Sequence, residues 1–172
     1  KKNISIASAR SGNIIGGGDW SKDRIIPDAI KAWEKNKILT VRQPKSIRPW
    51  QHVLDPIFGY IILAQKITLN KKLSDAYNFG PNLKESISVR SLVNLAKKYY
   101  GKGKISWRTN KQKMHESEWL GLNTKKTYKV LGFKNNLNLN QTIKNTIYWY
   151  KTFKVCKDIK KMCEYEIRKY LE

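Results

Sequence analysis

The amino-acid sequence predicts an α/β protein, because short strand-like segments alternate with longer segments of helical periodicity. Two runs, 38–41 and 76–79, are short, rich in apolar residues and followed closely by turn residues, as buried strands are. In segments such as 25–36, apolar residues recur every three or four positions, which is typical of a helix with one buried face. With 172 residues, of which 40% are hydrophobic, the chain can bury a core.

Local signals place each element in order. Pro27 suits the first turn of a helix, where a missing N–H costs nothing, and Asp55 suits the first turn of the next helix. Ser88 is a typical N-cap, and Gly101 follows the last turn of the helix that Ser88 begins. The expected strands are 4–7, 38–41, 76–79 and 104–108. The expected helices are 25–36, 53–69, 88–100, 124–131, 140–153 and 156–171.

The net charge of +22 suggests a polyanionic partner, nucleic acid above all. However, only seven of the 35 basic residues are arginine, and the lysines are scattered along a chain that is also rich in Asn and Ile. Nucleic-acid surfaces favour the bidentate contacts of arginine, and no nucleic-acid-binding motif is legible. We therefore attribute the charge to overall composition and expect no nucleic-acid partner. A basic nucleic-acid-binding α/β domain stays open as an alternative.

Cysteine, histidine and hydropathy patterns argue against several kinds of site. On one helix, Cys156 and Cys163 would lie roughly 10 Å apart, too far for a disulfide. Neither His52 nor His115 stands at a zinc-ligand spacing from them. No apolar run approaches the ~18 residues that a membrane helix needs, and no leader pattern opens the chain. We expect a reduced, cytoplasmic protein with no metal and no membrane partner.

Three patterns related to phosphate or cofactor binding are either incomplete or attributed to chance. The spacing from Gly12 to Gly17 fits a Walker loop, but Gly18 and Asp19 follow where Lys and Ser or Thr are required. The dinucleotide fingerprint is absent too, so the glycine triplet on its own favours a tight loop. Tyr-x-x-x-Lys, the acid/base pair of short-chain dehydrogenases, occurs three times, and we attribute all three matches to chance. These matches are Tyr100/Lys104, Tyr150/Lys154 and Tyr165/Lys169.

The segment 48–55 combines an arginine, an aromatic residue and a helix start. The Arg48 guanidinium offers two parallel donors and stays charged, which suits a diphosphate. An alternative of about equal weight is that Arg48 forms an ion pair with Asp55 and only packs the loop.

Several segments together carry a family resemblance. The segments 9–20 and 23–28 closely resemble sugar-nucleotide dehydratases of the extended short-chain dehydrogenase/reductase (SDR) superfamily. The form Gly-Gly-Gly-Asp-Trp is most similar to the members that act on CDP-glucose. Further matching segments follow in order along nearly the whole chain. They are 47–56, 77–81, 115–116, 131–133, 146–151 and 166–170.

The resemblance covers only part of such a protein. It implies the late strands of a Rossmann-type parallel sheet, followed by the smaller carboxy-terminal substrate-binding α/β domain. Residues 1–153 would be the carboxy-terminal part of the NAD-dependent epimerase/dehydratase domain, and 154–172 a carboxy-terminal helix. The amino-terminal part, with the NAD fingerprint and the catalytic Tyr/Lys pair, would be absent. The resemblance also implies a homodimer when the protein is full length.

The resemblance assigns substrate contacts residue by residue. Arg48 would bind the pyrophosphate, Asn13 the sugar or a phosphate, and Thr40 and Arg42 would line the base and ribose. Arg24 belongs to the same signature, without an assigned contact. The full set of implied substrate residues is Asn13, Arg24, Ile26, Pro27, Thr40, Arg42, Arg48 and His115.

NAD is the implied cofactor, held mainly by the missing part, with Ser11 and Gly12 beside the nicotinamide. No catalytic residue and no metal ligand is implied within these residues. The implied reaction converts CDP-glucose to CDP-4-keto-6-deoxyglucose with loss of water, which makes the full-length enzyme a lyase. The chain alone is expected to be inactive. Half of a related NAD(P)-dependent epimerase or dehydratase for another nucleotide sugar stays open as an alternative.

Overall fold

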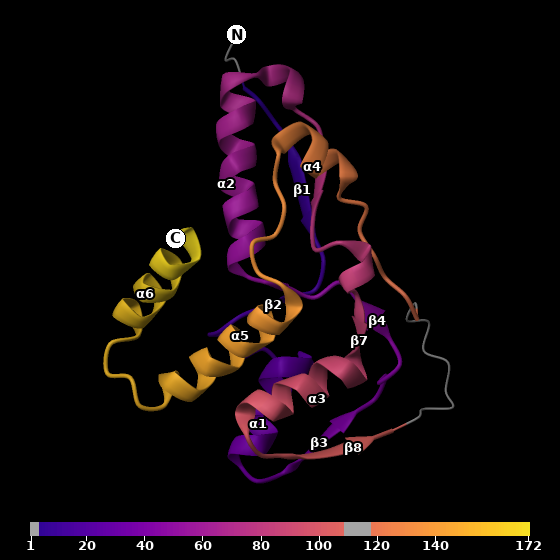
Figure 1. Cartoon of the computed structure of the whole chain (residues 1–172), viewed down its shortest axis with the longest axis vertical. Coiled ribbons are helices and arrows are strands. Elements are labelled where there is room, and N and C mark those ends of the chain that lie inside the picture. Colours follow the sequence, from indigo (N-terminus) through magenta and orange to yellow (C-terminus); the bar gives the residue numbers. More distant parts are fainter. Residues whose placement is uncertain (1–3, 109–117) are drawn as a thin grey trace.

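Pairs of short strands connected by helices form the framework of the computed structural model, which describes residues 4–108 and 118–172 (Figure 1). Three of the four strand pairs in this part of the chain are parallel. The parallel pairs are β1 (Ser8–Ser11) with β6 (Ala76–Phe79), β2 (Ile14–Ile15) with β5 (Gln51–His52), and β3 (Ile38–Val41) with β8 (Lys104–Trp107). The antiparallel pair is β4 (Ile47–Arg48) with β7 (Ile87–Ser88). The α/β prediction is confirmed.

Helices connect the strands in the predicted order. Ser88 caps its helix by accepting a 3.1 Å hydrogen bond from the Ser91 N–H, and Gly101 ends that helix with a φ of +93°. Both local signals therefore acted as predicted. The α-helices are α1 (Ile25–Glu34), α2 (Leu54–Leu69), α3 (Val89–Tyr100), α4 (Lys125–Leu131), α5 (Leu139–Phe153) and α6 (Ile159–Leu171). Two short 3₁₀ helices, η1 (Lys71–Leu73) and η2 (Leu83–Glu85), complete the set.

The strand predicted at 4–7 is wrong, because the strand in this region is β1 at Ser8–Ser11. The strand begins at Ser8, whose N–H donates to the carbonyl of Asp75, because its partner β6 starts only at Ala76. Ile4 and Ile6 lie beyond that partner and are more than 70% exposed. An alternating sequence therefore produces no strand where no neighbouring backbone is available to pair with it.

Two helix boundaries differ from the prediction by two residues or more. α1 ends at Glu34, two residues early, because Asn36 takes a left-handed φ of +53° and turns the chain into β3. α6 starts at Ile159, three residues late, because the Asp158 side chain accepts the Lys161 N–H and caps the helix there.

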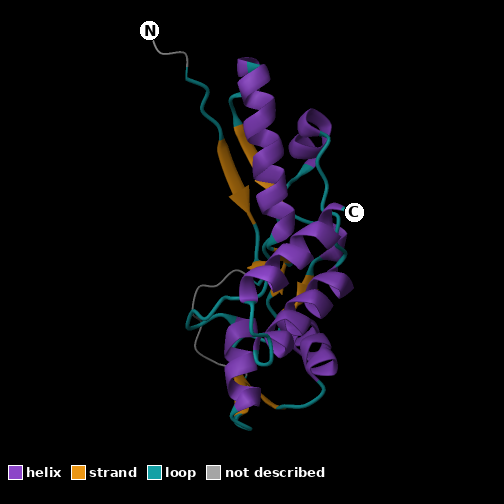
Figure 2. Cartoon of the chain, turned by 90° about the vertical axis from the view of Figure 1, so that its left-hand side faces the viewer, coloured by secondary structure: helices purple, strands orange, loops and turns teal. Residues whose placement is uncertain are grey.

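The core consists of two clusters. The larger one lies between α1, α3 and α5 and includes Trp33, Leu92 and Ile147, all about 1% exposed or less. The smaller one lies between α2, β6 and α4 around Phe79. Figures 1 and 2 show the result, an elongated molecule in which α2 and β1 extend away from the part that holds α1, α3 and α5. The segment that leads from β1 to α1 connects the two parts.

Helix α6 packs back onto the rest of the chain. Its Tyr170 hydroxyl donates a 2.9 Å hydrogen bond to Asp55 at the start of α2, and the Tyr170 ring lies edge-on to Phe58. Asp55 is fully buried and also accepts the Asn136 N–H at 2.8 Å. Three segments far apart in sequence therefore meet at one carboxylate.

The half-buried Glu166 on α6 predicts a pH-dependent stability. Burial raises its pKa to about 7, and Lys169 only partly opposes this. The folded state therefore binds more protons than the unfolded state between about pH 4.5 and 7, so stability falls as the pH rises through that window. Because the side chain is partly exposed, we expect a loss of only about 1 kcal/mol. In urea denaturation at pH 5 and pH 8, Glu166→Gln should reduce the stability difference between the two pH values by about 1 kcal/mol. Glu164→Gln, at an exposed position of α6, is the matched control, and an unchanged difference in Glu166→Gln would contradict the assignment.

Other sequence expectations concern single features. Cys156 and Cys163 are free thiols, although Cys156 lies before α6 and not on one helix with Cys163. Within the described ranges, no helix is long and apolar enough to cross a membrane. The same residues contain no group of three or more His, Cys, Asp or Glu side chains arranged to hold a metal ion.

Candidate functional site

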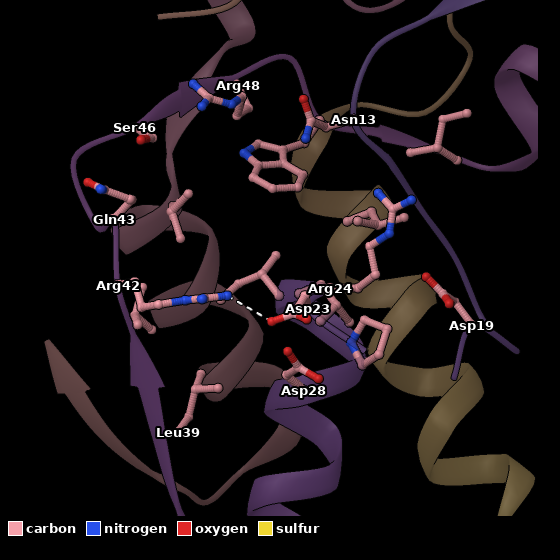
Figure 3. A pocket seen from close by; sticks show the side chains of 18 of the residues that line it. Asn13, Asp19, Asp23, Arg24, Asp28, Leu39, Arg42, Gln43, Ser46 and Arg48 are labelled. Carbon is pink, nitrogen blue, oxygen red and sulfur yellow. Dashed lines mark hydrogen bonds and ion pairs between the residues drawn. The ribbon is translucent and has the colours of Figure 1, made fainter. Parts of the chain in front are cut away.

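A cavity of about 340 Å³ opens beside the amino-terminal end of α1 (Figure 3). Its walls come from the segment after β1, the first turn of α1, the strand β3 and the segment from 42 to 50. Polar and charged side chains alternate with apolar ones around it. The lining residues are Asn13, Ile14, Ile15, Gly16, Asp19, Asp23, Arg24, Ile25, Ile26, Pro27, Asp28, Leu39, Thr40, Val41, Arg42, Gln43, Ser46, Arg48, Trp50 and Val89.

The structure brings the predicted substrate residues together. All of them that lie within the described residues line this one cavity, although they come from separate segments of the chain. They are Asn13, Arg24, Ile26, Pro27, Thr40, Arg42 and Arg48. The remaining predicted residue, His115, lies outside the described residues. The individual roles of these residues stay predictions.

Arg48 lies in the cavity wall without an acidic partner. Its guanidinium donates a 2.8 Å hydrogen bond to the carbonyl of Ile47, and among residues 4–108 and 118–172 it forms no ion pair. The alternative that Arg48 pairs with Asp55 is wrong, because the Asp55 carboxylate is buried elsewhere by Tyr170 and Asn136. The remaining donors of Arg48 are available to an anion.

Gln51 and His52, in the same segment as Arg48, form hydrogen bonds that hold the fold together. The Gln51 amide is buried, donates to the carbonyl of Phe79 at 3.0 Å and accepts from Asn135 at 3.2 Å. His52 Nδ1 accepts the Leu54 N–H at the start of α2, and burial lowers the pKa of His52 to about 4, so the ring is neutral. Within 48–55, Arg48 is therefore the charged side chain that the fold presents to the cavity.

The start of α1 offers a second attraction for an anion. Arg24 occupies the N-cap position, and no side chain caps the first turn of this ten-residue helix. The free backbone N–H groups and the helix dipole make such an end favourable for negative charge. Asp19 lies nearby as well. Burial alone would raise its pKa, but the Ser21 N–H, Arg24 and Lys31 together lower it.

An ion pair crosses another part of the cavity. Arg42 Nη2 lies 2.8 Å from Asp23 Oδ1, and Asp23 holds a left-handed backbone with a φ of +60° (Figure 3). Asp28, on the first turn of α1, lies beside this pair. Its pKa is raised by burial and by the charge of Asp23, against opposing effects of Lys31 and Arg42.

Sequence reasoning missed several side chains that line this cavity. They are Asp19, Asp23, Asp28, Gln43 and Ser46. Asp19 and Asp23 belong to the family signature, and Asp28 directly follows Pro27, so their proximity to predicted residues was the available signal. Their charge relations with Arg24 and Arg42 depend on the folded loop.

A second cavity, of about 560 Å³, adjoins the first and shares Asn13 and Arg24 with it. Both predicted cofactor residues, Ser11 and Gly12, line it. The Ser11 hydroxyl is hydrogen-bonded to the Tyr60 hydroxyl, and a Cβ on Gly12 would lie 2.8 Å from the Pro49 ring. Their place beside a nicotinamide stays a prediction. The glycine turn that would grip the pyrophosphate of NAD is not among them.

The glycine triplet is a closely packed turn. A Cβ on Gly17 would lie 2.0 Å from the Trp149 ring, and one on Gly16 would lie 2.5 Å from Val53. Gly18 has a φ of +80°. The expectation of a tight loop is therefore confirmed, although Gly16 and Gly17 also line the second cavity.

None of the three Tyr-x-x-x-Lys matches contributes its tyrosine to the lining of either cavity. Tyr100, Tyr150 and Tyr165 are absent from both linings. The Tyr150 hydroxyl instead donates at 2.6 Å to the carbonyl of Asp19, and burial raises the pKa of Tyr150 to about 12. Tyr150 therefore stays protonated and supports the loop. The attribution of all three matches to chance agrees with this arrangement.

Comparison with known sequences shows similarity to an enzyme of known activity. Over 170 residues, 98% of its length, the chain is 37% identical to CDP-glucose 4,6-dehydratase of Salmonella typhimurium strain LT2. The chain spans 47% of that protein, about half of its length. No protein-family model matches the chain.

Comparison with solved structures addresses the fold. UDP-glucuronic acid 4-epimerase from Bacillus cereus, in complex with UDP-glucuronic acid and NAD, matches with a TM-score of 0.73 at 18% identity, over 87% of this chain and 46% of that one. dTDP-glucose 4,6-dehydratase from Bacillus anthracis, in complex with NAD, matches with a TM-score of 0.67 at 18% identity, over 84% and 44%. The chain is thus a relative of CDP-glucose 4,6-dehydratase that has, over the part it covers, the fold of the extended SDR epimerases and dehydratases.

Proposed function

We propose that this chain is the substrate-binding portion of a CDP-glucose 4,6-dehydratase and that the cavity of about 340 Å³ beside α1 holds the nucleotide sugar. The observation that carries the proposal is the convergence of Asn13, Arg24, Arg42 and Arg48 on one cavity from separate segments. Its support from sequence is the similarity to the Salmonella typhimurium enzyme along 98% of the chain.

The charges around the cavity suit a diphosphate. Arg48 has donors without an acidic partner in the described part of the chain, and Arg24 stands at the uncapped start of α1. A guanidinium donates two parallel hydrogen bonds to phosphate oxygens, and a helix amino terminus adds backbone N–H donors. Anchoring the diphosphate in this way would orient the sugar at a distance from the anchor, toward Asn13.

The proposed reaction converts CDP-glucose to CDP-4-keto-6-deoxyglucose with loss of water, a lyase reaction. The chemistry that NAD supplies, when bound, is reversible hydride transfer. Ser11 and Gly12 would border the nicotinamide, and Asn13, which lines both cavities, would contact the sugar between them. The described residues of this chain would bind and orient the substrate.

No Tyr/Lys pair among the described residues lies at the cavities, so we propose that the chain alone is inactive. A homodimer of the full-length protein and a cytoplasmic location stay predictions of the same proposal.

Isothermal titration of the purified chain with CDP-glucose, dTDP-glucose and a DNA duplex tests the proposal. We expect saturable binding of CDP-glucose, weaker binding of dTDP-glucose, no binding of the duplex, and no conversion of CDP-glucose to a keto sugar when NAD is added. Equal affinity for both sugars would favour a related enzyme for another nucleotide. Binding of the duplex without either sugar would favour the nucleic-acid-binding alternative. Circular dichroism melting establishes that the titrated sample is folded.

A further inference from the structure

Two carboxylates in the cavity are left unexplained by a diphosphate. Figure 3 shows Arg48 and Asn13 toward one end of the cavity and Arg42, Asp23 and Asp28 toward the other. Carboxylates repel a phosphate, so Asp23 and Asp28 do not suit the anionic part of a nucleotide. A neutral group with hydrogen-bond donors suits them better.

Apolar surface lies next to these acids. Pro27 and Leu39 line the same cavity from α1 and β3, and both are buried in the folded chain. Val89 lines it as well. A flat ring can lie against such a wall while its edge meets polar groups, which is how cofactor and ligand pockets generally combine affinity with orientation.

We infer that Asp28 and Arg42 read the edge of the base of the bound nucleotide and select cytosine over uracil and thymine. This inference rests on the proposed function, because it requires a pyrimidine nucleotide in the cavity. The edge of cytosine presents an amino donor at position 4 and acceptors at N3 and O2. A carboxylate beside a guanidinium presents the complementary acceptor and donors.

The same pair disfavours the other pyrimidines. Uracil and thymine present a carbonyl oxygen at position 4, which would face the Asp28 carboxylate with two acceptors and no proton. Their N3–H would face the Arg42 guanidinium with two donors. Each mismatch leaves polar groups without partners in a site that is partly closed to water, and such losses discriminate more strongly than an added contact.

Asp23 positions Arg42 and does not itself contact the base. Its side chain is 76% exposed and already holds Arg42 at 2.8 Å, so it positions the guanidinium. Asp28 is half-buried on the first turn of α1 and lines the cavity beside the Arg42–Asp23 ion pair (Figure 3). The burial that raises the pKa of Asp28 also reduces the water available to it, which makes each mismatch costlier.

The test compares the dissociation constants of CDP and UDP by isothermal titration of the chain. We expect the parent to bind CDP at least about tenfold more tightly than UDP. Asp28→Asn should bring the ratio to within about twofold, since an amide offers a donor as readily as an acceptor. Arg42→Gln should also reduce the ratio, and because Arg42 is exposed this variant carries little risk of misfolding. Asp75→Asn, outside the cavity, is the matched control and should keep the parent's ratio.

The outcomes separate this inference from the proposed function. Equal binding of CDP and UDP by the parent, or an unchanged ratio in both Asp28→Asn and Arg42→Gln, overturns the base-reading role and leaves a nucleotide site in place. Failure of the folded parent to bind either nucleotide overturns the proposed function, and the inference with it. Loss of the CDP preference in the two cavity variants alone supports the inference.

Discussion

Replacing Arg48 with alanine is expected to weaken the binding of CDP-glucose by roughly 2–4 kcal/mol, because a desolvated diphosphate would lose two charge-assisted hydrogen bonds. The reason is structural as well as chemical. Arg48 lines the cavity, its guanidinium donates a hydrogen bond to the Ile47 carbonyl, and no carboxylate among the described residues forms an ion pair with it. Isothermal titration of the chain with CDP-glucose measures the loss directly.

Two further variants separate charge from geometry. Arg48→Lys should recover only part of the affinity, because a point charge does not reproduce two parallel donors. Arg168→Ala, on the exposed side of α6, removes the same charge away from the cavity and should leave binding unchanged. If Arg48→Ala binds CDP-glucose as tightly as the parent, Arg48 has only a packing role and the diphosphate site lies elsewhere.

Replacing Gly17 with alanine is expected to lower the free energy of unfolding by roughly 3 kcal/mol, through overpacking in the core. The new methyl group would lie 2.0 Å from two atoms of the Trp149 ring. Trp149 cannot move aside easily, because it is only 6% exposed, stacks on Phe153 and meets Tyr150 edge-on. Equilibrium denaturation in urea measures the effect.

Gly80→Ala provides the matched control. The nearest atoms to a Cβ at Gly80 are 3.8 Å away, an ordinary contact distance, and the substitution should change stability little. Equal stability of Gly17→Ala and the parent would show that the turn adjusts freely around Trp149. Since Gly17 also lines the second cavity, a destabilised turn would disturb the wall assigned to the nicotinamide as well.

Local sequence signals predicted those elements whose causes are local. The strands at 38–41 and 76–79 have the predicted bounds, and α3 begins after Ser88 and ends at Gly101. Each of these signals acts within a few residues, through a cap, a turn or an apolar run. The strand expected at 4–7 failed because pairing depends on a partner about 70 positions away, and β6 reaches only as far as Ser8.

Part of the site was also predictable, because the chemistry of a single residue does not depend on distant segments. Arg48 and Asn13 were identified by resemblance and by the chemistry of a guanidinium, and the structure places both in one cavity. The resemblance did not indicate that Asp28 would lie beside Arg42, or that Asp23 would pair with it. Those juxtapositions depend on a left-handed residue in the loop before α1, which no periodicity reveals.

By itself, the sequence determined the α/β class, the caps that begin and end helices, and the arginine available for a diphosphate, because these follow from residue chemistry and short-range spacing. Only the tertiary structure decided which charges meet. Asp55, seven positions from Arg48, is bound instead by Tyr170, 115 positions away, and this leaves the arginine available to the cavity. The physical reason is that a buried carboxylate takes whichever donor the packing of α2 and α6 brings within 3 Å, and packing joins segments irrespective of their separation in the chain.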